Sequence, residues 1–368
     1  MNAGTRLKMA LGAVSSLIST SPRHDSTARR PVTALASSRG LSFFTSFMKL
    51  LFLVLPALLS FACLAQETPK RPRITGISHA AFYVSDMAKA RAFYEGFLGF
   101  QSPYSIPRKD PKEQLVWIKI NDRQSVELFP GSEVSPETDR LYHIAVETDD
   151  AEAMRLYLQS KGVAVPPKTG IGKIGNKNYF VKDPNGNTVE IVEYLPDGWT
   201  MREKGKFLPA TRIAKRMSHV GVMIGQLDAS LKFYGEILGF KETWRGSTSG
   251  KTLNWVNLQV PEGEDYVEFM LYDKYPSLDR LHTMHHICLE LPDVEKAGAI
   301  LKTRPYPAGS KPPTEMKAGI NGKRQINYYD PDGTRVEVME PNTFDGKPRP
   351  PSKAPPPVAE SKPAVGLK

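Results

Sequence analysis

The sequence predicts an α+β fold of four βαβββ modules, which form two cup-shaped domains. Three observations support this prediction. Much of the 368-residue chain is an internal repeat, segments with the alternating apolar pattern of half-buried strands recur in both copies, and each copy contains apolar residues at helical spacing. The length allows two ordinary domains plus appendages, and 40% hydrophobic with 24% charged residues is typical of a soluble globular protein.

The first repeat, residues 74–195, predicts two modules, each with a strand, a helix and further strands. In the first module, four apolar residues at spacings of three and four predict the helix, and Gly99 is its stop signal. These four are Ala90, Phe93, Tyr94 and Phe97. In the second module, the sequence Asp-Pro-Asn-Gly at 183–186 predicts a tight turn between the last two strands. The segments are 77–84, 87–100, 114–120 and 125–129, then 141–148, 151–163, 178–183 and 188–194.

The second repeat, residues 216–341, shows the same order of segments. Its segments are 218–224, 228–240, 252–258 and 266–272, then 284–291, 294–303 and the hairpin 325–340. Residues 196–215, between the repeats, are polar and unpatterned, which predicts a linker or an interface segment. Pro, Lys and Ala dominate residues 342–368, a composition that predicts a disordered arm.

Two sets of four polar residues recur in the same order along the repeats, each within a strand pattern. Equivalent residues are 140 to 147 positions apart. Because neighbouring strand residues point to opposite faces, His143 and Glu190 project from the concave face while their apolar neighbours pack under helices. Two carboxylates in such a cup without a cation would each carry a large desolvation penalty, so the pattern predicts two metal sites. The candidate ligands are His79, Glu127, His143 and Glu190, and then His219, Glu268, His286 and Glu337.

The sequence leaves open how the ligands of these sites pair, and it decides between two adjacent histidines. The ligands of the first module can join those of the second module, or they can join those of the fourth module across the repeats. His285 stands beside His286, and alignment of HHICLE with YHIAVE selects His286 as the ligand. A metal-free cup that only binds a ligand is the remaining alternative to a metal site.

The motifs around these residues resemble a known family. HVGVMIGQLDASLKFYGEILGF, residues 219–240, resembles the opening signature of glyoxalase I, and HHICLELPD, residues 285–293, is similar to its second signature. HAAFYVSDMAKARAFYEGFLGF, residues 79–100, departs from the pattern at Ala80, where a β-branched residue is usual. The chain therefore resembles the vicinal oxygen chelate superfamily, which includes glyoxalase I, extradiol dioxygenases and bleomycin-resistance proteins.

The resemblance implies that the first and last strands of each module supply the metal ligands, and that the substrate is a small molecule. Two imidazoles and two carboxylates suit Zn²⁺, Ni²⁺, Fe²⁺ or Mn²⁺. A carboxylate that loosens from the metal can act as a general base, and Glu190 and Glu337 are the catalytic candidates.

Three classes of function compete. A metal-dependent isomerase or lyase acting on a 2-oxo or enediolate-forming substrate is the prediction, because both ligand sets are complete. An extradiol dioxygenase is the first alternative, although Phe180 and Asn327 stand where that group has a Tyr, and no His lies between 144 and 218 or after 286. A non-catalytic binding protein of the bleomycin-resistance kind is the second alternative.

The formal net charge of +10 comes from residues outside the repeats, since residues 74–341 carry 34 basic and 35 acidic residues. We therefore expect no nucleic-acid partner. Residues 48–65 read as a secretory signal peptide with an apolar run too short to span a bilayer, so we expect an exported protein without stable membrane insertion. Residues 1–47 read as a non-native or targeting extension, and Cys63 is a poor match to a lipid-anchor site. The oligomeric state is left open.

Overall fold

The computed structural model describes residues 69–108, 110 and 114–360. The expected N-terminal extension (1–47) and export signal (48–65), with Cys63, lie outside the described residues. Among the described residues, no helix is both long and apolar enough to cross a bilayer.

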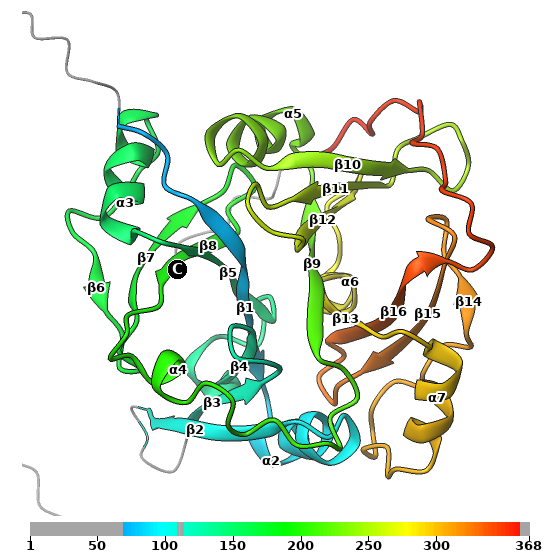
Figure 1. Ribbon diagram of the computed structural model, residues 1–368. Helices are drawn as coiled ribbons and strands as arrows, with labels where there is room; N and C mark the ends of the chain where they lie inside the picture. Colours follow the sequence, from blue (N-terminus) through cyan, green and yellow to red (C-terminus); the bar gives the residue numbers. More distant parts are fainter. Residues whose placement is uncertain (1–68, 109, 111–113, 361–368) are drawn as a thin grey trace, which may run out of the picture. The chain divides into compact units, whose positions relative to one another are not determined.

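The two repeats form two mixed sheets of eight strands, each curled into a half-barrel (Figure 1). The first sheet has the order β2-β3-β4-β1-β5-β8-β7-β6, and the second has the equivalent order β10-β11-β12-β9-β13-β16-β15-β14. The strands of the first sheet are β1 (Ile74–Val84), β2 (Gln101–Pro107), β3 (Gln114–Lys119), β4 (Ser125–Pro130), β5 (Leu141–Thr148), β6 (Gly170–Ile171), β7 (Lys177–Lys182) and β8 (Thr188–Glu193). Those of the second are β9 (Arg216–Ile224), β10 (Lys241–Gly246), β11 (Trp255–Gln259), β12 (Tyr266–Leu271), β13 (His286–Glu290), β14 (Lys317–Ala318), β15 (Lys323–Tyr329) and β16 (Arg335–Thr343).

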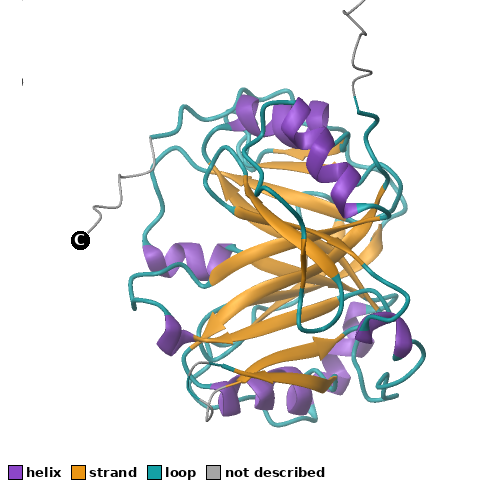
Figure 2. Ribbon diagram, turned by 90° about the vertical axis from the view of Figure 1, so that its left-hand side faces the viewer, coloured by secondary structure: helices purple, strands orange, loops and turns teal. Residues whose placement is uncertain are grey.

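Helices lie outside the strand layers, and one follows the first strand of each module (Figure 2). They are α2 (Met87–Arg91) with the π-helical η1 (Ala92–Phe97), α3 (Ala151–Ser160), α5 (Leu227–Ser230) with the π-helical η3 (Leu231–Ile237), and α7 (Val294–Lys302). Three further short helices are the 3₁₀ helix η2 (Gly131–Glu133) and the α-helices α4 (Trp199–Arg202) and α6 (Leu278–Met284). The order strand, helix and three strands therefore occurs four times, which confirms the predicted α+β fold of four βαβββ modules.

The first helix shows why these segments fold as the spacing predicts. The Asp86 side chain caps α2 by accepting a hydrogen bond from the amide of Lys89, which satisfies one free N–H of the first turn. The four apolar residues at helical spacing are all buried. Gly99 adopts a φ of 79°, a left-handed conformation that favours glycine and ends the helix.

Strand order brings the candidate ligands to the centre of each sheet. β1 pairs in parallel with β4 and antiparallel with β5, and β5 pairs in parallel with β8. The four central strands of the first sheet therefore carry one candidate ligand each, and β12, β9, β13 and β16 do the same in the second sheet. The module pairing that the sequence left open is thus within each repeat.

The outer faces of both sheets share one apolar core, which includes Phe82, Ile144 and Val189 of the first repeat and Val220 and Phe269 of the second. The residues beside the candidate ligands, such as Ile144 and Val189, point into this core as strand alternation predicts. The concave faces carry the candidate ligands together with separate apolar clusters, which include Trp117 and Phe129 in the first repeat and Met223 and Met270 in the second.

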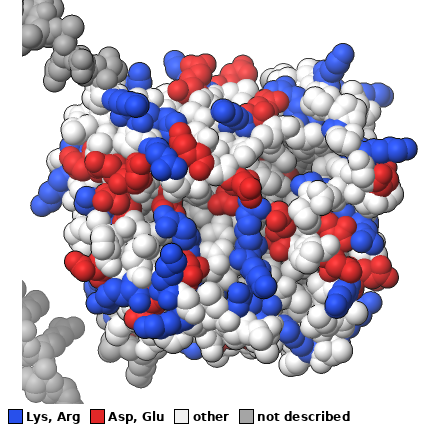
Figure 3. Space-filling view, in the orientation of Figure 1, with Lys and Arg blue, Asp and Glu red and all other residues white. Residues whose placement is uncertain are grey.

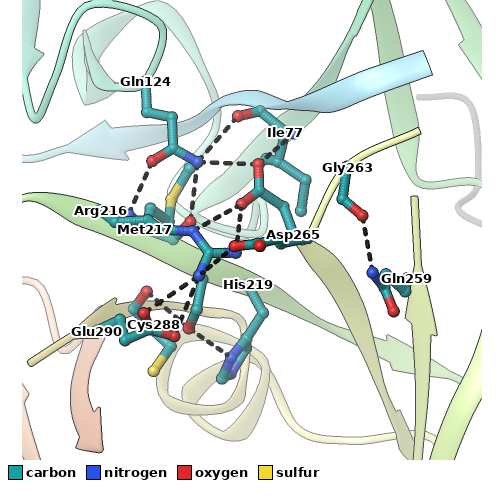
Figure 4. A network of polar contacts seen from close by, with 12 residues as sticks. Ile77, Gln124, Arg216, Met217, His219, Gln259, Gly263, Asp265, Cys288 and Glu290 are labelled. Carbon is teal, nitrogen blue, oxygen red and sulfur yellow. Dashed lines mark hydrogen bonds and ion pairs between the residues drawn. The ribbon is translucent and has the colours of Figure 1, made fainter. Parts of the chain in front are cut away.

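Polar contacts also join the repeats. The Gln124 side chain accepts a hydrogen bond from the Met217 amide at 2.9 Å and donates to the Met217 carbonyl at 2.8 Å, as Figure 4 shows. Asp265 accepts a bond from the Ile77 amide at 3.0 Å and forms an ion pair with Arg216, also at 3.0 Å. On the face shown in Figure 3, basic and acidic side chains are interspersed.

The C-terminal segment differs from the expected disordered arm over its described part, 342–360. Its backbone follows the edge of the second sheet: the Ser352 amide donates to the Arg245 carbonyl of β10, and the Leu253 amide donates to the Pro355 carbonyl, both at 2.8 Å. The proline-rich composition does not predict this packing. The segment covers an exposed strand edge through a few main-chain hydrogen bonds, and such bonds do not require apolar side chains.

The segment 196–215 packs on the first sheet and includes α4. Lys119 of β3 holds it by donating hydrogen bonds to the carbonyls of Glu203 and Lys206, at 2.7 and 2.9 Å. This places Trp199 over the concave face of the first repeat, close to the candidate ligands.

Candidate functional site

The first repeat gathers its four candidate ligands at one point of the concave face. Nε2 of His79 lies 2.9 Å from Nε2 of His143, and Oε2 of Glu190 lies 3.0 Å from each of these nitrogens. Glu127 lies slightly farther away, with carboxylate oxygens 3.4 Å from His79 Nε2 and 3.7 Å from His143 Nε2. We call this set the first quartet.

All four residues of the first quartet are at most 5% exposed. Burial raises the pKa of Glu127 and outweighs the opposing charges of His79 and His143. Burial also acts on Glu190, but the charge of His79 and hydrogen bonds from both imidazoles outweigh it and hold the pKa of Glu190 below its usual value. For His79, burial lowers the pKa, but the charges of Glu127 and Glu190 prevail and raise it. The two carboxylates are therefore chemically different.

A second layer of side chains orients the first quartet. Nδ1 of His79 lies 2.8 Å from the Ser78 hydroxyl, which lies 2.5 Å from the Tyr194 hydroxyl. Tyr194 also donates a hydrogen bond to the Arg123 carbonyl at 2.7 Å. The Asn178 amide donates to Oε1 of Glu190 at 2.6 Å. Such partners fix the ring orientation of a ligating histidine and the position of a ligating carboxylate.

The first quartet lies at the base of a cavity of about 290 Å³. Its walls are largely aromatic and apolar, and the side chains of Arg108 and Lys173 line it as well. The aromatic wall residues are Trp117, Phe129, Tyr142, Phe180, Tyr194 and Trp199. A cavity of this size and polarity suits a small organic ligand.

Several lining residues were not among the predicted site residues. Asn178 and Tyr194 lie on or next to strands and carry ordinary polar side chains, so alternation alone does not single them out. Trp199 follows Gly198 in the polar segment between the repeats, and its ring centroid lies 5.2 Å from that of Tyr104. A tryptophan inside an otherwise polar linker was the one available signal that this segment covers a site.

The second repeat places its four candidate ligands in the same order, but less closely. Nε2 of His219 lies 3.1 Å from Nε2 of His286. Oε2 of Glu337 lies 3.4 Å from His219 Nε2 and 3.5 Å from His286 Nε2, and Glu268 Oε2 lies 3.5 Å from the same His286 atom. We call this set the second quartet.

A guanidinium group lies against the second quartet. Nη2 of Arg335 is 2.6 Å from Nδ1 and 3.1 Å from Nε2 of His286. Burial, reinforced by the charge of Arg335, lowers the pKa of His286 to about 3. Burial raises the pKa of Glu268, whereas hydrogen bonds from both imidazoles overcome burial and lower the pKa of Glu337.

The neighbouring His285 points away from the second quartet. Its Nε2 lies 3.0 Å from Oδ2 of Asp139, a residue of the first repeat. Repeat alignment and strand parity thus agree with the structure on which of the two histidines faces the cup. Cys288 is buried in β13, and burial raises the pKa of its thiol well above the usual value.

The first quartet fits a divalent metal on the chemistry and spacing of its donors. Ligand bonds of about 2.1 Å place adjacent donor atoms about 3.0–3.4 Å apart, close to the separations within this set. In the described part of the chain, the ion-pair partners of Glu127 and Glu190 are His79 and His143, so a bound cation would neutralise two buried carboxylates. The second quartet fits less well, because a permanent cation already touches one of its imidazoles.

A family model described as Glyoxalase/Bleomycin resistance protein/Dioxygenase superfamily matches residues 76–191 and 216–338. Among curated proteins, human mitochondrial methylmalonyl-CoA epimerase is 27% identical over 128 residues, which are 32% of this chain and 73% of that protein. The lactoylglutathione lyase GLX1 of Arabidopsis thaliana is 23% identical over 216 residues, 55% of this chain and 67% of that protein.

Solved structures share the fold. The Mn(II)-bound glyoxalase from Novosphingobium aromaticivorans aligns with a TM-score of 0.53 and 17% identity, over 73% of this chain and 83% of that chain. The 2,3-dioxygenase LapB from Pseudomonas sp. KL28 aligns with a TM-score of 0.56 and 17% identity, over 76% of this chain and 97% of that chain. At this level of identity the likeness is one of fold.

Proposed function

Since the chain belongs to the Glyoxalase/Bleomycin resistance protein/Dioxygenase superfamily, we propose that its first cup is the active site of a metal-dependent isomerase or lyase. The substrate is a small molecule with vicinal oxygens, such as a 2-oxo or enediolate-forming compound. One observation carries the proposal: two imidazoles and a carboxylate oxygen lie 2.9–3.0 Å apart beneath a cavity of about 290 Å³. Two relatives are named as a lyase and an epimerase, which agrees with this class of reaction.

The four residues of the first quartet would hold Zn²⁺, Ni²⁺, Fe²⁺ or Mn²⁺, and the metal would act as a Lewis acid on the vicinal oxygens. The protein supplies orientation and proton transfer. Ser78 and Tyr194 position the ring of His79, and Asn178 positions Glu190. Trp117, Phe180 and Trp199 form apolar parts of the cavity wall, and an apolar wall strengthens the electrostatic interactions beside it.

The distances favour Glu127 over Glu190 as the carboxylate that moves the proton. Glu190 contacts both imidazoles at 3.0 Å and accepts a hydrogen bond from Asn178, so it is restrained on both oxygens. Glu127 lies 3.4 and 3.7 Å from the imidazoles, farther than Glu190, and accepts a hydrogen bond from the Trp117 side chain. A general base must leave its resting contacts to reach a substrate proton, and the contacts that Glu127 would lose are longer than those of Glu190. The sequence had pointed to Glu190 for this role.

An extradiol dioxygenase is the second candidate, supported by the fold of LapB. Two features of the first cup disfavour it. A three-residue set of two histidines and one carboxylate is typical of non-haem Fe²⁺ oxygenases, whereas Glu127 makes a fourth here. Phe180, at the position expected for a Tyr, has its ring centroid 5.3 Å from that of His143 and offers no hydroxyl for proton transfer.

Assays of the metal-loaded full-length chain test this proposal. The panel contains methylglyoxal hemithioacetals, methylmalonyl-CoA and catechols, each in D₂O with Zn²⁺, Ni²⁺, Mn²⁺ or anaerobic Fe²⁺. We expect metal-dependent turnover of a 2-oxo compound or thioester with deuterium incorporation at carbon. Oxygen consumption with ring cleavage of a catechol would instead support the dioxygenase, and tight binding without turnover of any compound would support a binding protein.

Export remains a proposal that rests on residues 48–65 alone. N-terminal sequencing of the protein after expression in a secreting host tests it. Cleavage close to residue 66 supports export, and retention of the segment in the cytosol contradicts it.

A further inference from the structure

The second cup has an arginine where the first cup has a threonine. Arg335 is the first residue of β16 and lies two positions before Glu337, so both side chains project from the same face. The equivalent residue of the first repeat is Thr188, the first residue of β8, whose hydroxyl accepts a hydrogen bond from Lys182 at 2.6 Å. The first cup therefore has no guanidinium at this position.

The hydrogen bonds of His286 show what Arg335 does there. Nδ1 of His286 lies 2.8 Å from the Met284 carbonyl and 2.6 Å from Nη2 of Arg335. The same Nη2 lies 3.1 Å from Nε2 of His286, so the guanidinium contacts both nitrogens of the ring. A group that stays protonated at every physiological pH thus lies against an imidazole that a metal ion would need as a ligand.

The shape of the site points the same way. A Cβ atom on Gly221 would lie 1.9 Å from Cε1 of His286. Gly221 faces His286 across β9 and β13 as Ala81 faces His143 across β1 and β5. The His286 ring therefore occupies space that a methyl group holds in the first repeat, and the His286–Glu337 separation of 3.5 Å exceeds the corresponding 3.0 Å in the first quartet.

We propose that the Arg335 guanidinium is the built-in cation of the second cup, so that the second quartet excludes a divalent metal and each chain holds a single metal ion, in the first cup. Two buried carboxylates, Glu268 and Glu337, need a counter-charge, and Arg335 supplies it from within the chain. A second positive group next to a guanidinium would be repelled at short range. The count of one ion rests on the function proposed for the first cup, whereas the exclusion from the second cup does not.

Metal content of the full-length protein tests this inference without an activity assay. Each variant is loaded with Zn²⁺ or Mn²⁺, passed over a desalting column and measured by mass spectrometry of the metal. We expect about one equivalent in the parent and about two in Arg335→Thr, which introduces the residue of the first repeat. Arg335→Lys keeps the charge and should stay at one, and Thr188→Arg, the reciprocal change, should fall to about zero.

The outcomes separate the two proposals. Two equivalents in the parent, or no gain in a folded Arg335→Thr variant, overturn the inference, and circular dichroism establishes folding. If Arg335→Thr does not fold, the metal content of Thr188→Arg tests the inference instead. Unchanged metal content in that variant would overturn the inference, because it would show that a guanidinium at this position does not exclude metal. A parent with no metal overturns the function proposed for the first cup, yet a gain of one equivalent in Arg335→Thr would still support the inference.

Discussion

Nη2 of Arg335 lies 2.6 Å from Nδ1 of His286, beside four candidate ligands that match those of the first repeat in kind and order. Arg335, at the first position of β16 where β8 has Thr188, places a guanidinium in one of two cups that share fold, strand order and candidate ligands. Duplication gives a protein two copies of a site, and a charge placed inside one copy can change its chemistry without changing its fold.

The Ser78–His79 contact gives a prediction about metal affinity. Ser78→Ala removes the 2.8 Å partner of Nδ1 and frees the ring to rotate, so we expect metal affinity of the first cup to fall by roughly 10- to 100-fold. Competition with a fluorescent chelator measures it. Ser218→Ala, the equivalent change beside His219, is the matched control and should leave the affinity unchanged. Equal effects of the two substitutions would contradict this account.

The two carboxylates of the first quartet should respond differently to amide substitution. Glu190→Gln removes the charge that contacts both imidazoles at 3.0 Å, so metal binding and turnover should both be lost. Glu127→Gln should keep most of the metal but lower kcat by roughly 10²- to 10⁴-fold, the range typical of a lost general base. Metal content and kcat are measured on the same preparations. A Glu127→Gln enzyme with nearly normal kcat would return the role to Glu190.

Asp330 gives a prediction about pH. It is fully buried, its Oδ1 accepts hydrogen bonds from the amides of Asp332 and Thr334, and Tyr94 of the other repeat lies 3.5 Å from Oδ2. Burial, with the charge of Asp332, raises the pKa of Asp330 from 3.8 to about 7. The folded state therefore binds a proton that the unfolded state releases between these two pH values, so stability falls as pH rises from about 4 to 7.

Each unit of pKa shift corresponds to about 1.4 kcal/mol, so this group alone should cost the folded protein roughly 4 kcal/mol above pH 7 relative to pH 4. Asp330→Asn keeps the acceptor for both amides but cannot ionise, and its unfolding free energy should change less over this range. Urea unfolding at pH 5, 6, 7 and 8, in the presence of a chelator, gives the comparison. Parallel pH profiles for parent and variant would show that Asp330 does not titrate in this window.

Trp199 tests the role of the segment between the repeats. Trp199→Ala removes one wall of the first cavity while leaving the first quartet in place, so small-molecule affinity should weaken and metal content should stay at the parental level. Trp244→Ala in the cavity of the second cup is the control, and it should affect neither quantity. Isothermal titration with the preferred substrate or an inert analogue measures the difference. Loss of metal from Trp199→Ala would mean that the segment supports the quartet itself.

Much of the fold could be predicted because its determinants are local and repeated. Alternation on strands such as 188–193 and helical spacing at Phe93 and Phe97 place the apolar residues on the core side, and the repeat shows each pattern twice. The pairing of β1 with β5 could not be predicted, since both pairings satisfy the same local patterns. The path of residues 342–360 was missed because main-chain bonds to a strand edge leave no trace in composition.

The sequence predicted the candidate ligands and the sheet face that they share, but not the roles of the residues around them. Periodicity placed His79, His143 and Glu190 on one face, and the structure brings them within 3.0 Å of one another. The roles of Arg335 and Trp199 depend on side-chain direction and on how a linker folds back, which no spacing rule encodes. Arg335 also stands at a strand start, where an exposed basic residue is ordinary.

Anomalous diffraction from crystals of the Mn²⁺- or Zn²⁺-loaded protein tests the central claim most directly. The account predicts one strong anomalous peak per chain, within bonding distance of His79, His143 and Glu190, and no peak beside Arg335. A peak of equal height between His219 and His286, or a metal-free first cup at saturating metal, would contradict it.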